Sequence, residues 1–317
     1  MKCVVTGGAG FIGSNLVDKL IDEGHEVGII DNLSTSDKSN INPKAKFYNL
    51  DITMNNMSNK TGNAVKQLGW PFDNWNVFKD VDVVFHLAAL ARVQPSIENP
   101  IKYHNTNVTG TLKMLKAAVN NNVKRFVFTS SSSVYGDVRE EDLPTTEEHP
   151  TNPMSPYALH KLIGEQYCKL FSELYGLETV CLRYFNVYGE RQPIEGAYTL
   201  VMGAFAKQLL DGKPMTINGD GEQRRDFTYV GDVVDANIKA MNYPLELNGD
   251  IFNIGNGDNR SVNQIATMMG GKRVHIEPVI EPKETLADNS KVKKTLNWKP
   301  TQDLKEWILN WVKSLKL

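Results

Sequence analysis

The stretch TGGAGFIG, residues 6–13, constrains the fold more than any other part of this 317-residue chain. It follows KCVVT (2–6), a short β-branched run typical of a buried strand, and precedes a segment with helical spacing of apolar residues. Gly7, Gly10 and Gly13 are spaced three residues apart. At a strand-to-helix turn, glycine permits a tight turn, close approach to a pyrophosphate and close packing of the helix on the strand. The stretch therefore predicts a dinucleotide-binding βαβ unit.

The acid that follows this turn indicates which dinucleotide is bound. The next predicted strand, EVGIID (26–31), ends in Asp31, about 20 residues beyond the glycines, where such units carry a ribose-binding acid. A carboxylate there accepts hydrogen bonds from the adenosine ribose and repels a 2′-phosphate, which favours NAD over NADP. The structural alternative is an ordinary βαβ turn followed by an unrelated aspartate.

The rest of the first half alternates strand-like and helical segments. Further predicted strands are KFYNLD (46–51), VDVVFHLAA (81–89) and KRFVFTSS (124–131). One predicted helix ends near Gly24 and has an apolar face formed by Ile12, Leu16, Val17, Leu20 and Ile21. A second helix is predicted across 104–120. This rhythm predicts a parallel sheet. The Asn-rich stretch 53–79 is expected to be a long surface insertion with room for one short helix, and the looser pattern after Arg183 predicts a smaller lobe.

Composition narrows the classes of partner. Lys+Arg 35 against Asp+Glu 37 gives a net charge of -2, which provides no basic field for nucleic acid and no polybasic membrane segment. Cys3, Cys168 and Cys181 are an odd number without a CxxC pair, so we expect free thiols in a reducing compartment and no zinc site. A strand at the N-terminus and no long apolar run lead us to expect a cytoplasmic protein with small-molecule partners.

The stretch SPYALHK, residues 155–161, predicts a pair of side chains that work together. Ser155 suits a helix N-cap and the proline after it suits the first helical position, so we expect a helix over 156–175 that ends at Gly176. Spacing of four places Tyr157 and Lys161 on one face. An adjacent ammonium and the helix N-terminus would both lower the pKa of the Tyr157 phenol. The alternative is a chance pair on a helix surface.

Other stretches, taken with these two motifs, resemble one family. They are Asp31-Asn32, Asp51-Ile52, HLAA (86–89), NVTGT (107–111), SSSSVYGD (130–137), RYFNVYG (183–189), GDGEQRRDFTYVGDVV (219–234) and ETLADNSK (284–291). Over nearly its full length the chain resembles the extended short-chain dehydrogenase/reductase family, and within it the nucleotide-sugar 4-epimerases similar to UDP-glucose 4-epimerase.

The resemblance implies a fold and its division into domains. The fold is α/β, a Rossmann-type doubly wound parallel sheet with a smaller α/β substrate-binding lobe. We expect the NAD-binding domain over 1–180, with a contribution from about 225–247, and a mainly substrate-binding lobe over 181–317. The resemblance also implies a homodimer.

It further implies residue roles. Tyr157 would be the general base, Lys161 would hold the nicotinamide ribose, and Ser131 would hydrogen-bond the reacting sugar hydroxyl. Asn186 and Arg225 would bind the substrate diphosphate, for which the planar guanidinium of arginine is well suited. The residues expected to bind NAD are Gly7, Gly10, Phe11, Ile12, Gly13, Asp31, Asn32, Asp51, Ile52, Leu87, Ala88, Ala89, Asn107, Tyr157, Lys161 and Tyr184. No metal is expected.

The implied reaction inverts the configuration at C4 of a UDP-sugar. Tyr157 takes the 4-OH proton while the C4 hydride goes to NAD, the 4-keto sugar turns over, and the hydride returns to its other face. Related dehydratases carry an acidic residue just after the serine or threonine, whereas this chain has Ser132 and Ser133 there. UDP-glucuronate 4-epimerases share a very similar serine run and remain an alternative. NAD-sensing proteins of this fold usually lose the tyrosine and lysine.

The segment before LAD both departs from the family and bears on the choice of sugar. Relatives often have an arginine there that clamps the diphosphate, but EPVIEPKETLAD (277–288) contains none, and the spacing supports neither Lys283 nor Arg224 as its replacement. Thr285 is expected to border the C2 substituent of the sugar. Its small side chain leaves room for an N-acetyl group, so we expect UDP-N-acetylglucosamine and UDP-N-acetylgalactosamine as substrates besides UDP-glucose and UDP-galactose.

Overall fold

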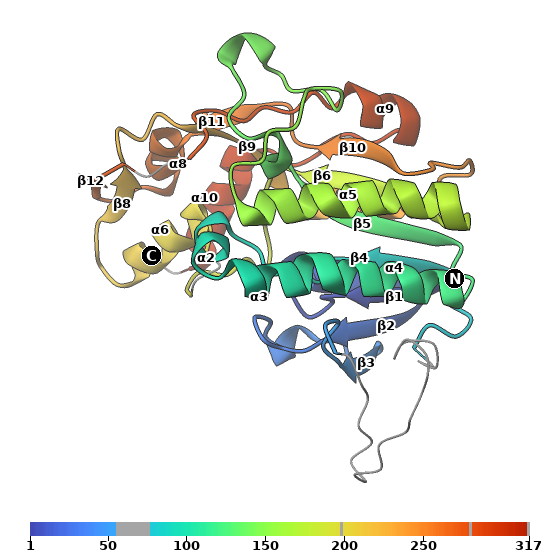
Figure 1. Ribbon diagram of the computed structural model, residues 1–317. Helices are drawn as coiled ribbons and strands as arrows, with labels where there is room; N and C mark the ends of the chain where they lie inside the picture. The colour runs from blue at the N-terminus through green and yellow to red at the C-terminus, as the bar shows by residue number, and fades with distance from the viewer. Residues whose placement is uncertain (55–76, 197–198, 279–280, 316–317) are drawn as a thin grey trace. The chain divides into compact units, whose positions relative to one another are not determined.

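The computed structural model of the protein describes residues 1–54, 77–196, 199–278 and 281–315 (Figure 1). These residues form two compact units. The first comprises Met1–Ser130, Ser155–Leu182 and Ala240–Ile251, and the second comprises Ser131–Met154, Arg183–Lys239 and Phe252–Leu317. The serines that follow Ser130 thus group with the second unit, and the short segment Ala240–Ile251 groups with the first.

The first unit is built on a seven-stranded sheet whose strand order is β10-β6-β5-β4-β1-β2-β3. The strands are β1 (Lys2–Thr6), β2 (Glu26–Asp31), β3 (Lys46–Asn49), β4 (Val83–His86), β5 (Arg125–Ser131), β6 (Glu178–Tyr184) and β10 (Asp250–Ile254), of which the last residues of β5, β6 and β10 belong to the second unit. The register pairs β1 with β2 and β4, β2 with β3, and β4 with β5, all in parallel. The predicted Rossmann-type α/β sheet is therefore confirmed.

Helices cover this sheet. They are α1 (Phe11–Asp22), α2 (Val93–Glu98), α3 (Pro100–His104), α4 (Thr111–Asn120) and α5 (Pro156–Tyr175), with the short helices η1 (Lys38–Asn40) and η2 (Asn105–Gly110). Figure 1 shows α4 and α5 lying side by side across one face of the strands. On α1 the predicted apolar face is buried at Leu16, Val17 and Leu20, whereas Ile12 and Ile21 are only half-buried.

Several predicted boundaries were wrong; the strand expected over 81–89, for example, is confined to β4, Val83–His86. The helix expected across 104–120 begins earlier, because α3 starts at Pro100 and continues through the π-helical turn η2 into α4. The strand expected over 46–51 ends at Asn49, because the Asp51 carboxylate accepts hydrogen bonds from the backbone and hydroxyl of Thr53 and so forms a turn. Most of the insertion expected over 53–79 lies outside the described residues.

The first unit has its own apolar core. Val4, Ile30, Val84 and Phe126 from the strands pack with Met114 and other buried residues of the helices, and Val77 and Phe78 add to the same cluster. Cys3, Cys168 and Cys181 are buried free thiols. In the part of the chain that the structure describes, no group of three His, Cys, Asp or Glu side chains is arranged to hold a metal ion. No described helix is long and apolar enough to cross a membrane.

The second unit contains two small sheets and several helices. One sheet has the order β11-β9-β7 and the other pairs β12 with β8. The elements are η3 (Ser132–Tyr135), η4 (Glu140–Asp142), β7 (Asn186–Tyr188), α6 (Val201–Leu210), β8 (Met215–Asn218), β9 (Arg224–Tyr229), α7 (Val230–Asn242), β11 (Asn259–Ser261), α8 (Val262–Met269), β12 (Arg273–Ile276), α9 (Ser290–Leu296) and α10 (Leu304–Ser314). The last residues of α7 belong to the first unit. The core of the second unit includes Tyr188, Phe205, Ile217, Phe227 and Ile265.

Candidate active site

The glycine loop between β1 and α1 is shaped to take a phosphate group. Gly7 has φ of +71°, and a Cβ there would lie 2.8 Å from the Ala88 backbone nitrogen. A Cβ on Gly13 would lie 2.1 Å from the Gly7 carbonyl oxygen. Gly10 is the N-cap of α1 and provides no side-chain hydrogen bond, so the first amides of the helix, at Phe11 and Ile12, are not covered by a capping side chain. These features fit a dinucleotide pyrophosphate.

Asp31 ends β2 beside this loop. Its side chain is buried, and its carboxylate accepts hydrogen bonds from the backbone amides of Ala9 at 3.1 Å and Leu33 at 2.8 Å and from the Ser36 hydroxyl at 3.2 Å. A carboxylate has about four lone-pair positions, so it can also accept a hydrogen bond from a ribose hydroxyl. Asp31 therefore fixes the glycine loop as well as being the predicted ribose ligand.

Three further residues that are expected to bind NAD come from two neighbouring strand ends. Asn32 donates a hydrogen bond to the Asp51 carboxylate at 2.9 Å. Ile52 is buried, and its side chain would be the first contact of any Cβ added at Gly110. The structure thus brings Asn32, Asp51 and Ile52 together beyond the carboxyl ends of β2 and β3, where α/β proteins of this class bind ligands.

A chain of hydrogen bonds that the sequence did not reveal holds the loop after β4. The Ala88 amide donates to the Thr6 hydroxyl at 3.2 Å, and that hydroxyl lies 2.8 Å from Nδ1 of His86. Nε2 of His86 lies 3.0 Å from the Thr111 hydroxyl, which donates to the Asn107 carbonyl at 2.7 Å. Because Thr111 donates to Asn107, its oxygen accepts from His86, which places a proton on Nε2, and a neutral ring then accepts from the Thr6 hydroxyl at Nδ1. Burial, with a smaller contribution from the charge of Lys161, lowers the pKa of His86 to about 3, which agrees.

Asn107 fixes the same loop from the π-helical turn η2. Its amide group donates to the Leu90 carbonyl at 2.9 Å and accepts from the Leu90 amide at 2.8 Å. Leu87, Ala88 and Ala89, the predicted cofactor residues, are half-buried in the loop that Asn107 and His86 hold at its two ends. In the sequence, the only local sign of this hydrogen-bonded chain was His86, a histidine inside an apolar strand. The residues that His86 contacts lie far away in the sequence.

Tyr157 and Lys161 occupy the first turns of α5 as predicted. Ser155 caps the helix by accepting the Ala158 amide, and Gly176 ends it in a left-handed conformation. The Lys161 ammonium lies 6.0 Å from the centroid of the Tyr157 ring and donates to the Thr129 carbonyl of β5 at 2.8 Å. The backbone amide of Tyr157 donates to the Ser96 hydroxyl of α2 at 3.1 Å. The pair is therefore anchored to both β5 and α2.

The Lys161 side chain is buried, unlike most lysines. Burial lowers the pKa of its amine to about 8, while the charges of Glu165 and then Cys168 act in the opposite direction. The amine stays mostly protonated at neutral pH and titrates just above it. A buried ammonium beside a phenol is suited to holding a ribose hydroxyl and to favouring the phenolate.

Ser131 is the first residue of the second unit and caps the short helix η3. Its hydroxyl accepts from the Ser133 amide at 3.2 Å and from the Ser133 hydroxyl at 2.9 Å. The side chain is half-buried. Its own hydroxyl proton can therefore be donated to another acceptor, as the predicted role requires.

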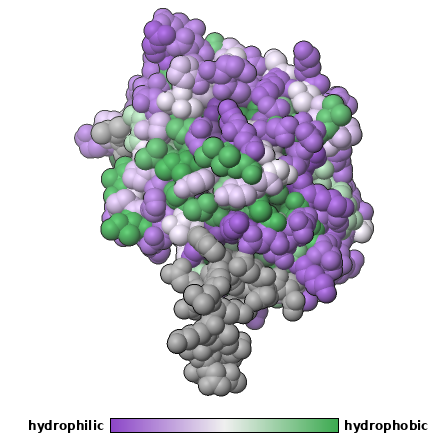
Figure 2. All heavy atoms as spheres, turned by 45° about the vertical axis from the view of Figure 1, so that its right-hand side comes forward, coloured by the Kyte–Doolittle hydropathy of each residue, from purple (hydrophilic) through white to green (hydrophobic). Residues whose placement is uncertain are grey.

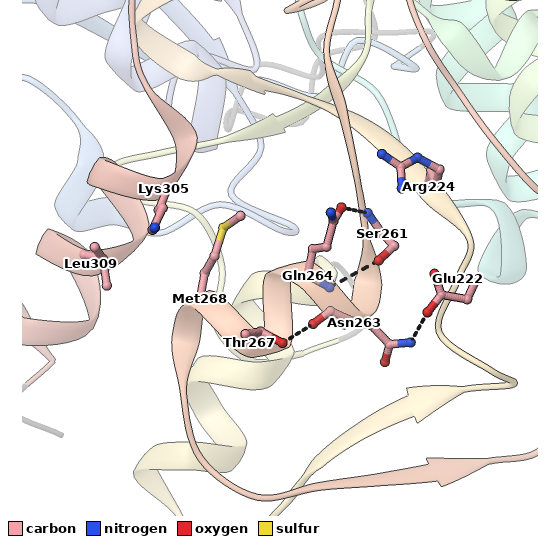
Figure 3. A pocket seen from close by; sticks show the side chains of 9 residues that line it. All are labelled: Glu222, Arg224, Ser261, Asn263, Gln264, Thr267, Met268, Lys305 and Leu309. Carbon is pink, nitrogen blue, oxygen red and sulfur yellow. Dashed lines mark hydrogen bonds between the residues drawn. The ribbon is translucent and has the colours of Figure 1, made fainter.

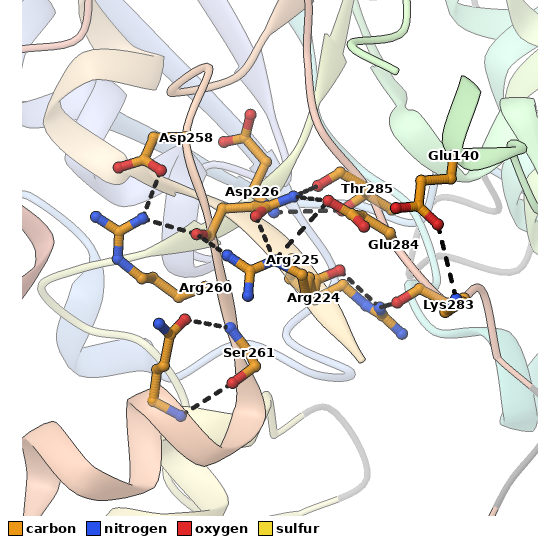
Figure 4. A network of polar contacts seen from close by, with 12 residues as sticks. Glu140, Arg224, Arg225, Asp226, Asp258, Arg260, Ser261, Lys283, Glu284 and Thr285 are labelled. Carbon is orange, nitrogen blue, oxygen red and sulfur yellow. Dashed lines mark hydrogen bonds and ion pairs between the residues drawn. The ribbon is translucent and has the colours of Figure 1, made fainter. Parts of the chain in front are cut away.

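Three other predicted substrate residues lie close together in the second unit. Asn186 on β7 donates to the Asp226 carbonyl of β9 at 3.4 Å. The Thr285 hydroxyl accepts from the Asp226 amide at 3.3 Å. Arg225, which precedes Asp226 on β9, donates to the Glu281 carboxylate at 2.5 Å and to the Arg224 carbonyl at 2.8 Å. Figure 4 shows the polar contacts around Arg225 and Thr285.

Asp226 organises this group from a fully buried position. Its carboxylate accepts the backbone amides of Asn256 at 2.7 Å, Gly257 at 2.9 Å and Ala287 at 3.1 Å. Burial raises the pKa of this carboxyl to about 6, although these three hydrogen bonds act to lower it. The same residue thus joins β9, the loop after β10 and the segment that carries Thr285.

Neither Arg224 nor Lys283 takes a clear position in place of the missing arginine. Arg224 donates to the side chain and the carbonyl of Asn259 at 2.7 and 3.1 Å, and its guanidinium also lies 3.8 Å from Glu284. Lys283 is largely exposed, with its ammonium 4.0 Å from Glu140. Both contacts appear in Figure 4.

Tyr184, predicted to bind the cofactor, is buried in the second unit. Its hydroxyl accepts a hydrogen bond from the Asn237 side chain of α7 at 2.7 Å.

A pocket of about 560 Å³ lies on the second unit, lined by Glu222, Arg224, Ser261, Asn263, Gln264, Thr267, Met268, Lys305 and Leu309 (Figure 3). Its polar groups largely bond one another: Ser261 and Gln264 form a capping box, and Asn263 bonds Glu222 and accepts from Thr267. None of the predicted substrate residues lines it, and we assign it no ligand.

The sheet, the glycine loop and the Tyr157–Lys161 pair define an NAD-binding protein of the extended short-chain dehydrogenase/reductase class. Residues 3–255 match the profile of the NAD dependent epimerase/dehydratase family, and the chain belongs to this family. Dependence on NAD, predicted from the sequence, is thereby confirmed.

Three similar proteins illustrate the relationship. A Methanocaldococcus jannaschii protein, whose name assigns it provisionally as a UDP-glucose 4-epimerase, is 42% identical over 321 residues, with 98% of each chain covered. The UDP-glucose 4-epimerase of Thermotoga maritima, solved with UDP-glucose, is 35% identical with a TM-score of 0.90, covering 100% of this chain and 99% of that one. The UDP-N-acetylglucosamine 4-epimerase of Methanobrevibacter ruminantium, in complex with UDP-N-acetylmuramic acid, is 35% identical with a TM-score of 0.86, covering 98% and 97%.

Proposed function

We propose that this protein is an NAD-dependent 4-epimerase of UDP-hexoses that interconverts UDP-glucose and UDP-galactose. The observation that carries the proposal is the pairing of Tyr157 with a buried Lys161 on one face of α5, in the same unit as the glycine loop and Asp31. The three relatives described above are named as UDP-sugar 4-epimerases, and two were solved with UDP-sugars bound, which supports the substrate class.

The chain's own residues account for binding and proton transfer. Bound NAD supplies a reversible hydride acceptor for C4 of the sugar. Tyr157 takes the proton from the 4-OH group and later returns it, so it acts as general base and then as general acid. Lys161, held by the Thr129 carbonyl, orients a ribose hydroxyl and stabilises the phenolate. Ser131 donates a hydrogen bond to the reacting hydroxyl group.

Arg225 and Asn186 are proposed to hold the diphosphate. The guanidinium of Arg225 is half-buried and bonded to Glu281, so a diphosphate must compete with that carboxylate. It can do so because it carries more negative charge and offers paired oxygens to the planar guanidinium. The fixed position of Thr285 beside Asp226 leaves a small side chain at the proposed sugar-binding segment, which supports acceptance of N-acetylated sugars.

We further propose that the enzyme is a cytoplasmic homodimer. On α5 the exposed residues Leu159, Leu170 and Leu174 follow helical spacing along one face, and Ile97 and Ile101 of the α2 and α3 segment are exposed as well. Figure 2 shows hydrophobic side chains gathering across the face on which Figure 1 draws α4 and α5. An exposed apolar helix face of this kind suits a second copy of the chain. The three free thiols support a reducing compartment.

The test is a direct assay of the purified protein. UDP-galactose, UDP-N-acetylglucosamine and UDP-glucuronate are each incubated with it, and the sugar nucleotides are separated by chromatography. We expect UDP-galactose to yield UDP-glucose without net reduction of added NAD. Conversion of UDP-glucuronate alone would transfer the assignment to that epimerase activity. Absence of conversion for every UDP-sugar, with NAD bound, would overturn the proposal.

A further inference from the structure

Glu165 is a buried carboxylate for which the proposed reaction has no role. It lies on α5 four residues after Lys161 and is only 2% exposed. Its Oε1 accepts a hydrogen bond from the Ser130 hydroxyl at 2.5 Å. Ser130 stands between Thr129, whose carbonyl binds the Lys161 ammonium, and Ser131. Glu165 and Lys161 therefore hold neighbouring residues at the end of the same strand.

The energetics of burial connect the two side chains. An isolated buried carboxylate or ammonium costs several kcal/mol, and such groups persist where they compensate one another. Residues one helical turn apart lie on the same face, so the side chains of Glu165 and Lys161 are neighbours on α5. The charge of Glu165 is the largest influence that opposes the effect of burial on the pKa of Lys161, ahead of that of Cys168.

The other titratable groups near this ammonium do not replace Glu165. His86 on β4 and His160 on α5 both sense the charge of Lys161, and burial lowers their pKa values to about 3 and about 4, so both are neutral at pH 7. His104 of α3 packs against His160 at a ring distance of 5.4 Å. Tyr157 is the proton-transfer group itself. Among the described residues that act on Lys161, Glu165 supplies the compensating carboxylate.

We propose that Glu165 is a positioning residue, whose carboxylate keeps Lys161 in its ammonium form and, through Ser130, fixes the end of β5. The proposal rests on the proposed function, because Lys161 matters for catalysis only if Tyr157 and NAD act as described. Two effects are combined in one side chain, a charge and a hydrogen-bond acceptor. They can be separated by substitution.

The first variant, Glu165→Gln, keeps an oxygen that accepts from Ser130 and removes the charge. The sign follows from the pKa of Lys161, which is about 8 and which the Glu165 charge raises. Without that charge the amine loses its proton at lower pH. We expect the alkaline limb of the pH profile of kcat/KM to move down by about one pH unit, the usual effect of an opposite charge nearby. The affinity of the cofactor-free protein for NAD, measured by fluorescence titration across pH, should begin to fall at a correspondingly lower pH.

Two controls isolate the cause. Glu173→Gln makes the same change on the same helix at an exposed position, where Lys169 lies 4.0 Å away, and should leave both profiles in place. Ser130→Ala removes the hydrogen bond and keeps the carboxylate. We expect it to leave the midpoint of the alkaline limb within about 0.3 pH units of the parent, a smaller effect than loss of the charge.

The outcomes are distinct. A folded Glu165→Gln protein whose activity and NAD-binding profiles superimpose on those of the parent overturns the proposal, as does a change in kcat or KM without a shift in pH. If Glu165→Gln does not fold, the double variant with Lys161→Met removes both charges: restored folding supports their pairing, and continued failure contradicts it. A parent that binds NAD but converts no UDP-sugar overturns the proposed function, and the NAD-binding profile still decides the role of Glu165.

Discussion

At the scale of single residues, Tyr157 offers the most direct test of the chemistry. Tyr157→Phe keeps the ring and the backbone hydrogen bond to Ser96 but removes the hydroxyl that we propose moves the proton. We expect turnover to fall by ~100-fold or more, the usual contribution of general acid–base catalysis. NAD affinity and the melting temperature should stay near those of the parent. Near-full activity in this variant would place the proton path elsewhere.

Asp31 is predicted to set the choice between NAD and NADP. The ratio of NADP to NAD affinity should rise roughly tenfold or more in Asp31→Arg, because attraction replaces repulsion of the 2′-phosphate. The structure adds that three donors end on this carboxylate, so the arginine also loosens the glycine loop and weakens both cofactors. Asp31→Asn serves as the control: it removes the charge at constant size and should give a smaller rise. Equal affinity of the parent for both cofactors would contradict the assignment.

Thr285 tests the size limit for the sugar. A tyrosine there should exclude an N-acetyl group, since a packed site cannot take extra atoms without strain of roughly 1 to 3 kcal/mol. We expect Thr285→Tyr to lower kcat/KM for UDP-N-acetylglucosamine at least about tenfold relative to UDP-glucose. Thr285→Ser is the matched control, because it keeps the hydroxyl that accepts the Asp226 amide. A ratio unmoved by the tyrosine would mean that another residue limits the pocket.

Residue types and spacing were enough to propose part of the candidate site. Gly7, Gly13 and the Tyr157–Lys161 pair follow from local rules, because turn geometry and helical spacing involve neighbours in the chain. The contacts of His86 and Glu165 did not follow from such rules. Their partners, Thr6 and Ser130, lie 80 and 35 positions away, and only the parallel sheet brings them together.

At the scale of elements, the close packing of α5 on β5 depends on Gly164. A Cβ there would lie 2.2 Å from Cζ of Phe128, a fully buried ring beneath the Lys161 ammonium. Gly164→Ala should therefore push α5 away from β5 and destabilise the protein by about 1 to 3 kcal/mol, more than the helix propensity of alanine returns. Chemical denaturation measures the loss, and weaker NAD binding should accompany it because Lys161 moves with the helix.

Gly28 on β2 supplies the control for that prediction. A Cβ at this position would meet Tyr48 at 3.4 Å and Val4 at 3.5 Å, which are ordinary contacts. Gly28→Ala should leave stability within about 0.5 kcal/mol of the parent. If Gly164→Ala proved as stable as Gly28→Ala, α5 would have room to shift on the sheet.

At the scale of the whole molecule, the strands of the sheet follow from local patterns, whereas the grouping of segments into units depends on distant contacts. Runs of apolar residues and helix caps are local signals, so β1, β2 and α5 were found with correct bounds. The placement of 131–154 in the second unit depends on distant bonds within it. Thr145 pairs with the segment at Leu286 and Asp288, and the Tyr135 hydroxyl donates to Asn253 at 2.7 Å. Pairings of this range leave no local trace in a single sequence.

The proposed homodimer gives the last prediction. In a two-fold interface each residue is present twice, so a charge placed on the apolar face of α5 would be buried at two symmetry-related places. We expect Leu170→Glu combined with Leu174→Glu, side chains that are 45% and 69% exposed, to convert the dimer into a monomer. Sedimentation velocity measures the change. The parent should sediment as a dimer at micromolar concentration, a range in which interfaces of standard size remain associated.

A matched pair of substitutions separates this effect from a general effect of charge. Leu210 on α6 and Leu245 in the loop after α7 are 43% and 64% exposed, nearly the same as the two α5 residues, and lie on other elements. Leu210→Glu combined with Leu245→Glu adds the same charge and should leave the dimer intact. Only burial against a second copy would make equally exposed leucines differ in their response to an added charge. If both double variants behaved alike, or if the parent were a monomer, the α5 face would therefore not be the interface.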